Sequence, residues 1–191
     1  IKTRYSMTKH KNQNQVPEWL SKAREKWQYT GQTRPPFAEE PKPGQRSIWD
    51  FPRPPALVPF FKEVEVCTNG IQLGCTTKAL ELQETASPPT YYLCPEDIMV
   101  PLTKRTSLCE GKGEALYWAF KTAPEKAIAW SYANPFKGYT ALKDYVAFYP
   151  QYLECYVNGE RVRPQPGAFY AGWITDDVRG PFKGSPGTGH W

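Results

Sequence analysis

Twenty prolines and fourteen glycines are distributed along this chain of 191 residues. Proline lacks a backbone donor, and glycine weakens the interior of a helix or strand, so long regular elements are interrupted again and again. This pattern favours short strands joined by turns. No apolar run approaches the roughly 20 residues that a bilayer-spanning helix needs, and we expect no membrane segment. We recognise no secretory signal.

Apolar and polar residues alternate with a period of two from Phe60 onward. Val64 and Val66 alternate with acidic residues and are followed by Asn69-Gly70, while Asn158-Gly159 separates a second pair of strands. Asn-Gly is typical of two-residue hairpin turns. The sequence therefore predicts a mainly β fold, an antiparallel sheet folded on itself as a sandwich or barrel. Further short aromatic-rich strands are expected at 90–93, 115–120, 127–132 and 145–149.

Charge divides the chain into unequal parts. Residues 1–46 hold ten Lys or Arg and four Asp or Glu, whereas the remaining residues are almost neutral. We predict a basic N-terminal arm at 1–46 with a short helix at 17–27, a core β domain at 47–160, and a C-terminal extension at 161–191 that packs on the core. Both termini are expected to be extended and rich in Pro or Gly. We expect Met7 to be the native first residue.

The helix of the arm is expected to be amphipathic. Trp19, Leu20, Ala23 and Trp27 share one face, and we expect the tryptophans to dock on the body or on a neighbouring subunit. The arm is thus a candidate for homo-oligomer formation. Basic arms also bind nucleic acid, but we expect these aromatic residues to pack on protein rather than on bases.

Cysteine and histidine usage excludes several kinds of catalysis. Five cysteines without a C-x-x-C pair indicate a reducing, cytoplasmic environment rather than a disulfide framework. The only histidines are His10 and His190, one near each end. Cysteine–histidine or serine–histidine catalysis and a zinc site therefore lack their usual residues. We expect neither a metal nor a cofactor.

One predicted strand, 79–84, places a carboxylate near the core. Leu80, Leu82 and Glu84 share parity, so Glu84 points into the interior with the leucines unless the strand ends before it. Tyr91 and Tyr92 must face opposite sides of the next strand. We expect at most one of them in the core and assign Tyr92 to a pocket.

The other candidate site residues lie near turns and aromatic runs. Lys112 stands between two glycines and is able to reach an anion, and a lysine near Cys109 can lower the pKa of that thiol. A buried, inert thiol remains the alternative for Cys109. Asp97 is either a ligand contact or a turn residue. Trp130 and Tyr132 share a strand face that forms a pocket wall or part of the core.

The segment GSPGTGHW, at 184–191, has the glycine spacing of a phosphate-binding loop. Such a loop also needs a lysine and a serine or threonine after the second glycine. Here His190 and Trp191 occupy those positions, so we do not expect nucleotide hydrolysis. The segment is instead a candidate docking tail.

Five segments together resemble a known family. They are SIWDFPRPP (47–55), LQETASPPTYYLCPEDI (82–98), CEGKGEALYW (109–118), AWSYANP (129–135) and GYTALKDYVAFYP (138–150). They are similar to the domain-of-unknown-function 427 family, and the extension at 161–191 resembles that of one group of its members. The resemblance implies a compact antiparallel β-tent-like domain. The family is in places labelled a nucleotidyltransferase, but the glycine–serine and paired-aspartate pattern of that chemistry is not found.

Three hypotheses of function follow. The first is a domain that binds a small polar or anionic ligand in an aromatic pocket; its residues would be Glu84, Tyr92, Asp97, Lys112, Trp130 and Tyr132. The second is a protein-interaction or oligomerisation module that uses the N-terminal arm. The third is an enzyme with Lys112 or Cys109 as nucleophile and Glu84 or Asp97 as acid–base group.

Overall fold

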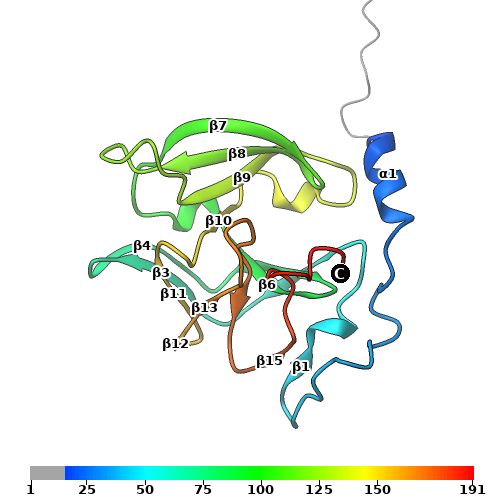
Figure 1. The fold of residues 1–191 in the computed structure, drawn as a ribbon. Coiled ribbons are helices and arrows are strands. Elements are labelled where there is room, and N and C mark those ends of the chain that lie inside the picture. Colours follow the sequence, from blue (N-terminus) through cyan, green and yellow to red (C-terminus); the bar gives the residue numbers. More distant parts are fainter. Residues whose placement is uncertain (1–15) are drawn as a thin grey trace, which may run out of the picture.

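The computed structural model describes residues 16–191, and at Cys109 only the backbone. Two antiparallel sheets dominate it, so the predicted mainly β class is confirmed. In Figure 1 the strands β7, β8 and β9 form an upper layer, and β3, β4, β11 and β12 lie in a lower one. Residues 31–44 contain neither helix nor strand, as the prolines there predict.

The larger sheet has seven strands. Its central members include the predicted strand at 79–84 and the aromatic-rich segments expected to be strands. Its edges are β2 and β7, and most residues of β7 are exposed. In spatial order the strands are β2 (Ala56–Phe60), β5 (Ala79–Glu84), β6 (Ser87–Leu93), β10 (Val146–Phe148), β9 (Ala129–Pro135), β8 (Gly113–Ala119) and β7 (Thr103–Glu110).

The smaller sheet has four strands and contains both predicted hairpins. Asn69 and Gly70 have φ values of 48° and 76°, and Asn158 and Gly159 have φ values of 50° and 80°. Two successive residues at positive φ match the right-handed twist of the flanking strands, which is why Asn-Gly is favoured there. Both hairpins are confirmed. In spatial order the strands are β12 (Glu160–Arg161), β11 (Glu154–Val157), β3 (Val64–Thr68) and β4 (Ile71–Thr76).

The large sheet is covered on both faces, which corrects one expectation. Tyr91 and Tyr92 are each only 1% exposed, although we expected at most one of them in the core. Tyr91 belongs to a core shared with the four-stranded sheet, together with Val66 and Trp173. Tyr92 belongs to a second core inside the curved sheet. Adjacent residues of a strand still face opposite sides, but here both sides are buried.

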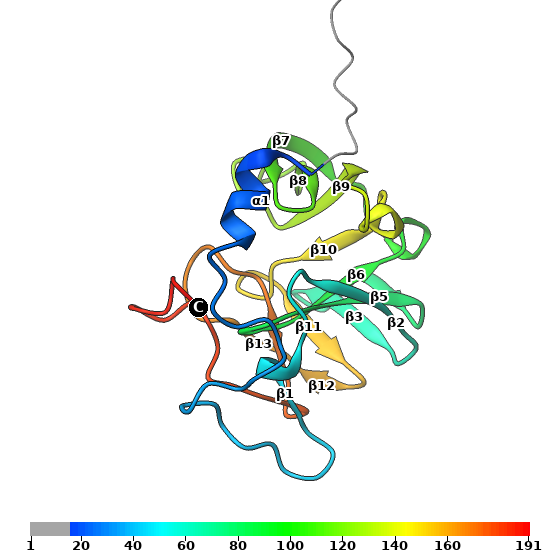
Figure 2. The same cartoon turned by 90° about the vertical axis from the view of Figure 1, so that its right-hand side faces the viewer.

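The N-terminal segment packs on the body through Leu20 of its helix and through Trp27, which follows the helix. Helix α1 (Glu18–Arg24) buries Leu20, which approaches Gly111 in the β7–β8 turn. Trp19 is 52% exposed, so about half of its surface is not packed on the body, and its docking on a neighbouring subunit stays a prediction. Trp27 is partly buried, and the guanidinium of Arg53 lies 5.3 Å from its ring centroid. In Figure 2 the chain runs from α1, beside β7 and β8, down the molecule to β1.

A third aromatic cluster joins the arm to the end of the chain. Trp49 packs edge-on against Tyr29, Phe37 and Trp191, with ring centroids 5.3–5.4 Å apart. The segment 184–191 therefore folds back onto the arm. The short elements around these clusters are β1 (Arg46–Ser47), η1 (Ile48–Asp50), η2 (Pro95–Asp97), η3 (Thr140–Leu142), β13 (Arg163–Pro164), β14 (Trp173–Ile174) and β15 (Val178–Arg179).

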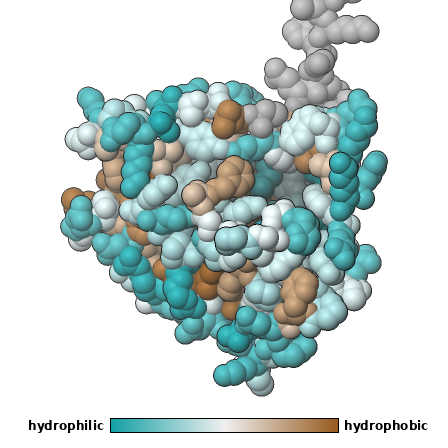
Figure 3. All heavy atoms as spheres, in the orientation of Figure 1, coloured by the Kyte–Doolittle hydropathy of each residue, from teal (hydrophilic) through white to brown (hydrophobic). Residues whose placement is uncertain are grey.

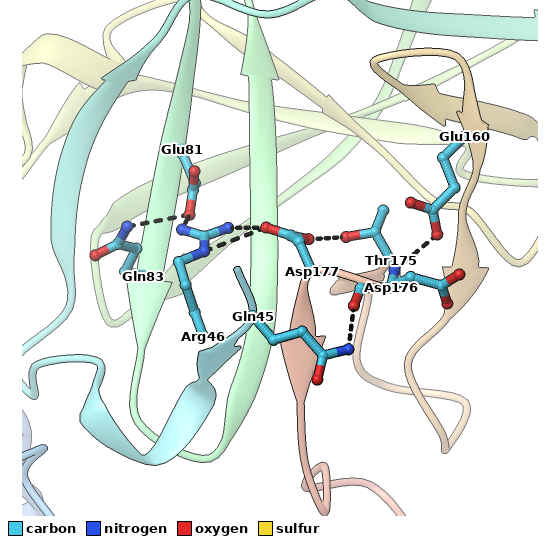
Figure 4. A network of polar contacts seen from close by, with 8 residues as sticks. All are labelled: Gln45, Arg46, Glu81, Gln83, Glu160, Thr175, Asp176 and Asp177. Atoms are coloured by element: carbon cyan, nitrogen blue, oxygen red, sulfur yellow. Dashed lines mark hydrogen bonds and ion pairs between the residues drawn. The ribbon is translucent and has the colours of Figure 1, made fainter. Parts of the chain in front are cut away.

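Arg46 links three separate parts of the chain through its guanidinium (Figure 4). Its Nη1 donates to Glu81 Oε1 at 2.6 Å, and its Nη2 donates to Asp177 Oδ2 at 2.7 Å. The side chain of Glu81 is only 3% exposed, and Gln83 also donates to it. The strand β1, which contains Arg46, pairs in parallel with β15, the strand that follows Asp177. The arm, the core strand β5 and the extension are thus joined at one guanidinium, which pairs with the buried carboxylate of Glu81 and with Asp177.

Several large apolar side chains of the described residues are exposed. Phe61, Ile71 and Met99 are among them, and the face in Figure 3 shows small brown groups among teal and white ones. No helix within residues 16–191 is long and apolar enough to cross a membrane. The four cysteines whose side chains are described are all free thiols.

We predict that Arg46→Met destabilises the fold by about 3 kcal/mol, because Glu81 is then buried without its cation. Arg163→Met is the matched control, since its partner Asp176 is 81% exposed and that pair contributes less than about 1 kcal/mol. Denaturant-induced unfolding measures both. Adding Glu81→Leu to Arg46→Met should recover part of the loss; equal losses in the two single variants would contradict this account.

Candidate functional site

A cavity of about 540 Å³ lies against the inner side of the seven-stranded sheet. Residues 165–172 of the C-terminal extension close it from the opposite side, so two distant parts of the sequence form its walls. The lining side chains are mainly aromatic, and a few charged groups are placed among them. The lining residues used below are Glu84, Tyr92, Arg105, Glu110, Lys112, Tyr117, Glu125, Lys126, Trp130, Tyr132, Tyr149, Tyr152 and Phe169.

Five of the six ligand-binding residues expected from the sequence line this cavity. They come from three strands and one turn and are Glu84, Tyr92, Lys112, Trp130 and Tyr132.

The remaining candidates lie elsewhere or are not described. Asp97 is in η2, where its carbonyl oxygen faces Gly74 of β4, and it does not line the cavity. Its backbone N–H donates to the carbonyl oxygen of Cys94 within this short helical turn. The side chain of Cys109 is outside the described part of the structure; its backbone pairs with Glu114.

Strand periodicity explains how the residues converge. Leu82 and Glu84 share parity on β5 and both line the cavity, as the alternation predicts, although the β5–β6 register shifts between them. Trp130 and Tyr132 share parity on β9. Residues from β5, β6, β7, β8 and β9 all line this one cavity.

Glu110 is the polar centre of the aromatic wall. Tyr132 donates its hydroxyl to Glu110 Oε2 at 2.9 Å, and Tyr117 donates to Oε1. Farther along the wall, Trp130 Nε1 donates to the Tyr92 hydroxyl at 3.3 Å. Three donors of the wall are therefore already engaged within the protein.

Aromatic rings continue from this centre toward the surface. The rings of Trp130 and Tyr149 lie 4.7 Å apart, and those of Tyr149 and Tyr152 lie 5.9 Å apart. The ammonium of Lys126 sits 3.8 Å from the Tyr152 ring centroid, an arrangement in which a cation is attracted by the π face. Phe169 of the opposite wall is 81% exposed and lies at the rim.

Burial keeps the tyrosines of the wall in their neutral form. Desolvation raises the pKa of Tyr92, Tyr117 and Tyr132 well above its usual value, and it raises that of Tyr149 to about 12. The negative charge of Glu110 raises the pKa of all four tyrosines further. Neutral phenols remain hydrogen-bond donors to Glu110.

The carboxylate of Glu84 forms an ion pair with the buried guanidinium of Arg53. Arg53 Nε lies 3.5 Å from Glu84 Oε1, and Nη2 of the same guanidinium donates to the carbonyl of Thr85 at 2.7 Å. The side chain of Arg53 is 2% exposed and is also covered by Trp27. Its desolvation lowers the pKa of the guanidinium from its usual value. The carboxylate of Glu84 is therefore already partnered by a cation.

The rim carries charges of both signs. Arg105 and Lys126 are exposed, Lys112 is partly buried, and Glu125 is an exposed carboxylate beside them. Among the described residues, none of these three cations forms an ion pair within 4.0 Å. They are available to an anionic group at the cavity entrance.

The sequence reasoning missed Glu110, Tyr149 and the whole opposite wall. Glu110 shares parity with Leu108 and Thr106 on β7, and all three line the cavity, so alternation along β7 was a usable signal. Nothing local indicated that residues 165–172 return to this face, because their position depends on the pairing of β13 with β14 and of β1 with β15.

Comparison with known proteins identifies most of this region. Residues 56–159 match the family described as "Domain of unknown function (DUF427)", which is more than half of the chain. The match includes all cavity residues from Leu82 to Tyr152, whereas the wall at 165–172 lies beyond it. No curated protein matched the sequence.

We predict that the cavity tyrosines ionise late in an alkaline titration. A raised pKa means that the folded state favours the neutral phenol, so this stabilisation is complete below pH about 10 and is lost as pH rises toward the folded pKa, about 12 for Tyr149. Phenolate absorbance of folded and urea-unfolded protein measures the difference. Ionisation of all twelve tyrosines together near pH 10 in a folded protein would be evidence against it.

Proposed function

The chain belongs to the domain-of-unknown-function 427 family, and from the geometry of its cavity we propose that it binds a small polar organic ligand. The observation that carries this proposal is the cavity of about 540 Å³, with aromatic walls and a few convergent polar groups. Small-molecule sites have this size and composition. A planar or aromatic body on the ligand would lie against Trp130 and Tyr149.

The rim supports an anionic group on the part of the ligand nearest the solvent. Arg105, Lys112 and Lys126 lie around the entrance, and their charges attract anions during encounter. Glu125 partly offsets this attraction. The proposed ligand is therefore small and polar, with an acidic group tolerated or favoured at its outer end.

Catalysis receives less support from the same residues. A nucleophile and its base must lie within hydrogen-bond reach of each other. Within the described structure, Glu84 pairs with Arg53, and Lys112 makes no side-chain hydrogen bond or ion pair. We propose a binding domain, in keeping with the cytoplasmic location expected from its cysteines.

Thermal-shift screening against a library of small metabolites tests the proposal. A ligand present at a hundredfold excess over its Kd contributes about 2.7 kcal/mol, which raises Tm by roughly 5–10 °C for a chain of this size. For an acidic ligand, Lys112→Ala should weaken binding about two- to fivefold, because one partly screened charge pair is lost. Lys137→Ala, exposed and outside the cavity, is the control. A library without any stabilising compound would refute the proposal.

Self-association through the arm is a second candidate, supported by one observation. Trp19 is 52% exposed on α1, although its helix is docked. If the arm mediates oligomer formation, Trp19→Ser should lower the mass measured by sedimentation at high concentration. Phe61→Ser, at an aromatic residue that is 78% exposed elsewhere, should leave it unchanged. The same monomeric mass for all three proteins would rule this candidate out.

A further inference from the structure

Glu110 is a carboxylate without a counter-cation inside the cavity. In the part of the chain that the structure describes, it forms no ion pair within 4.0 Å, in contrast to Glu84 and its arginine. Its hydrogen-bond partners there are the neutral hydroxyls of two tyrosines, and its side chain is only partly exposed to solvent. Charge in such surroundings is costly unless a partner of opposite sign is supplied. The position that such a partner would occupy is the cavity itself, which Glu110 lines.

The hydrogen bonds of the wall leave acceptors facing the cavity. Tyr117 and Tyr132 use their hydroxyl protons on Glu110, and Trp130 uses its indole N–H on Tyr92. Each carboxylate oxygen can accept more than one hydrogen bond, and a phenolic oxygen that donates can also accept. This side of the cavity therefore offers oxygen lone pairs to a ligand that brings its own donors.

The faces of the aromatic rings also favour a cation in the cavity. Trp and Tyr rings carry negative potential on their faces and attract ammonium groups within about 6 Å. The protein already uses this attraction at the rim, where Lys126 lies 3.8 Å from the Tyr152 ring centroid. Trp130 and Tyr149 continue that surface inward toward Glu110.

We propose that the inner end of the ligand is a protonated amine, which pairs with Glu110 among the rings of Tyr117, Trp130 and Tyr132. This inference rests on the proposed binding function and defines its ligand class: an amine whose outer end is polar or acidic and faces the rim. The cations Arg105, Lys112 and Lys126 and the carboxylate Glu125 also line the cavity, and they act on the outer end.

Three probes with the same para-hydroxyphenyl-ethyl body isolate the inner group: tyramine, the alcohol tyrosol and the acid phloretate. Binding is measured by calorimetry and by tryptophan fluorescence. We expect tyramine to bind at least about tenfold more tightly than tyrosol, because a hydrogen bond between an ammonium and a carboxylate is stronger than one from a neutral hydroxyl. Phloretate should be the weakest of the three.

Two isosteric variants locate the effect. Glu110→Gln should abolish the preference for tyramine over tyrosol, whereas Glu125→Gln, which removes another carboxylate that lines the cavity, should retain it. Thermal unfolding establishes that each variant is folded. If Glu110→Gln does not fold, the ranking of the three probes on the unchanged protein decides alone.

Different results would contradict the amine assignment and the proposed binding of a small ligand. Three outcomes would overturn the amine assignment and leave small-ligand binding standing. One is that tyrosol or phloretate binds as tightly as tyramine or more tightly, and another is that the preference for tyramine persists in folded Glu110→Gln. The third is a library whose binders are acids and neutral molecules without amines. A library without any binder would overturn both.

Discussion

The contact of Arg46 with Glu81 and Asp177 is the interaction on which the arrangement of the site depends. Glu81 is buried in the sheet, and a carboxylate there is tolerated because a guanidinium reaches it. The same guanidinium holds Asp177, which fixes the extension beside the arm. Residues 165–172 connect β13 to β14 within that extension and line the cavity. A buried ion pair on one face of the sheet thereby positions the wall of a cavity on the other.

The two faces of the large sheet differ in what packs against them. On one face Tyr91 packs with Trp173 in an apolar core between the two sheets. On the other, Tyr92 and its neighbours are equally buried but retain hydroxyl groups, a carboxylate and open volume. Tyrosine suits both faces, since its ring is buried like that of phenylalanine while its hydroxyl meets a partner. The tyrosines thus belong at once to the stability of the fold and to the chemistry of the cavity.

The sequence allowed the strands, the hairpins and one wall of the cavity to be predicted, because these depend on local patterns. Alternation placed Glu84 with Leu82, and Trp130 with Tyr132, and Asn-Gly located both turns. The errors arose where distant segments meet. Whether a strand is covered on one face or on both depends on the second sheet, which decided the burial of Tyr91. The docking of α1 through Leu20 depends on the β7–β8 turn, and the second wall depends on the return of residues 165–172. No pattern within a short segment encodes such contacts.

The order of strands in the large sheet determines which strands form its edges, where another chain could add a strand. Its two edges are β2 and β7, whose outer backbone groups have no neighbouring strand among residues 16–191. Pro59 removes a donor from β2, while Lys104 and Arg105 lie on β7 where its register with β8 shifts. Proline, like charge and irregular pairing, discourages a foreign strand from extending a sheet. Within the described residues, both edges of the large sheet therefore carry features that discourage its growth by strand addition.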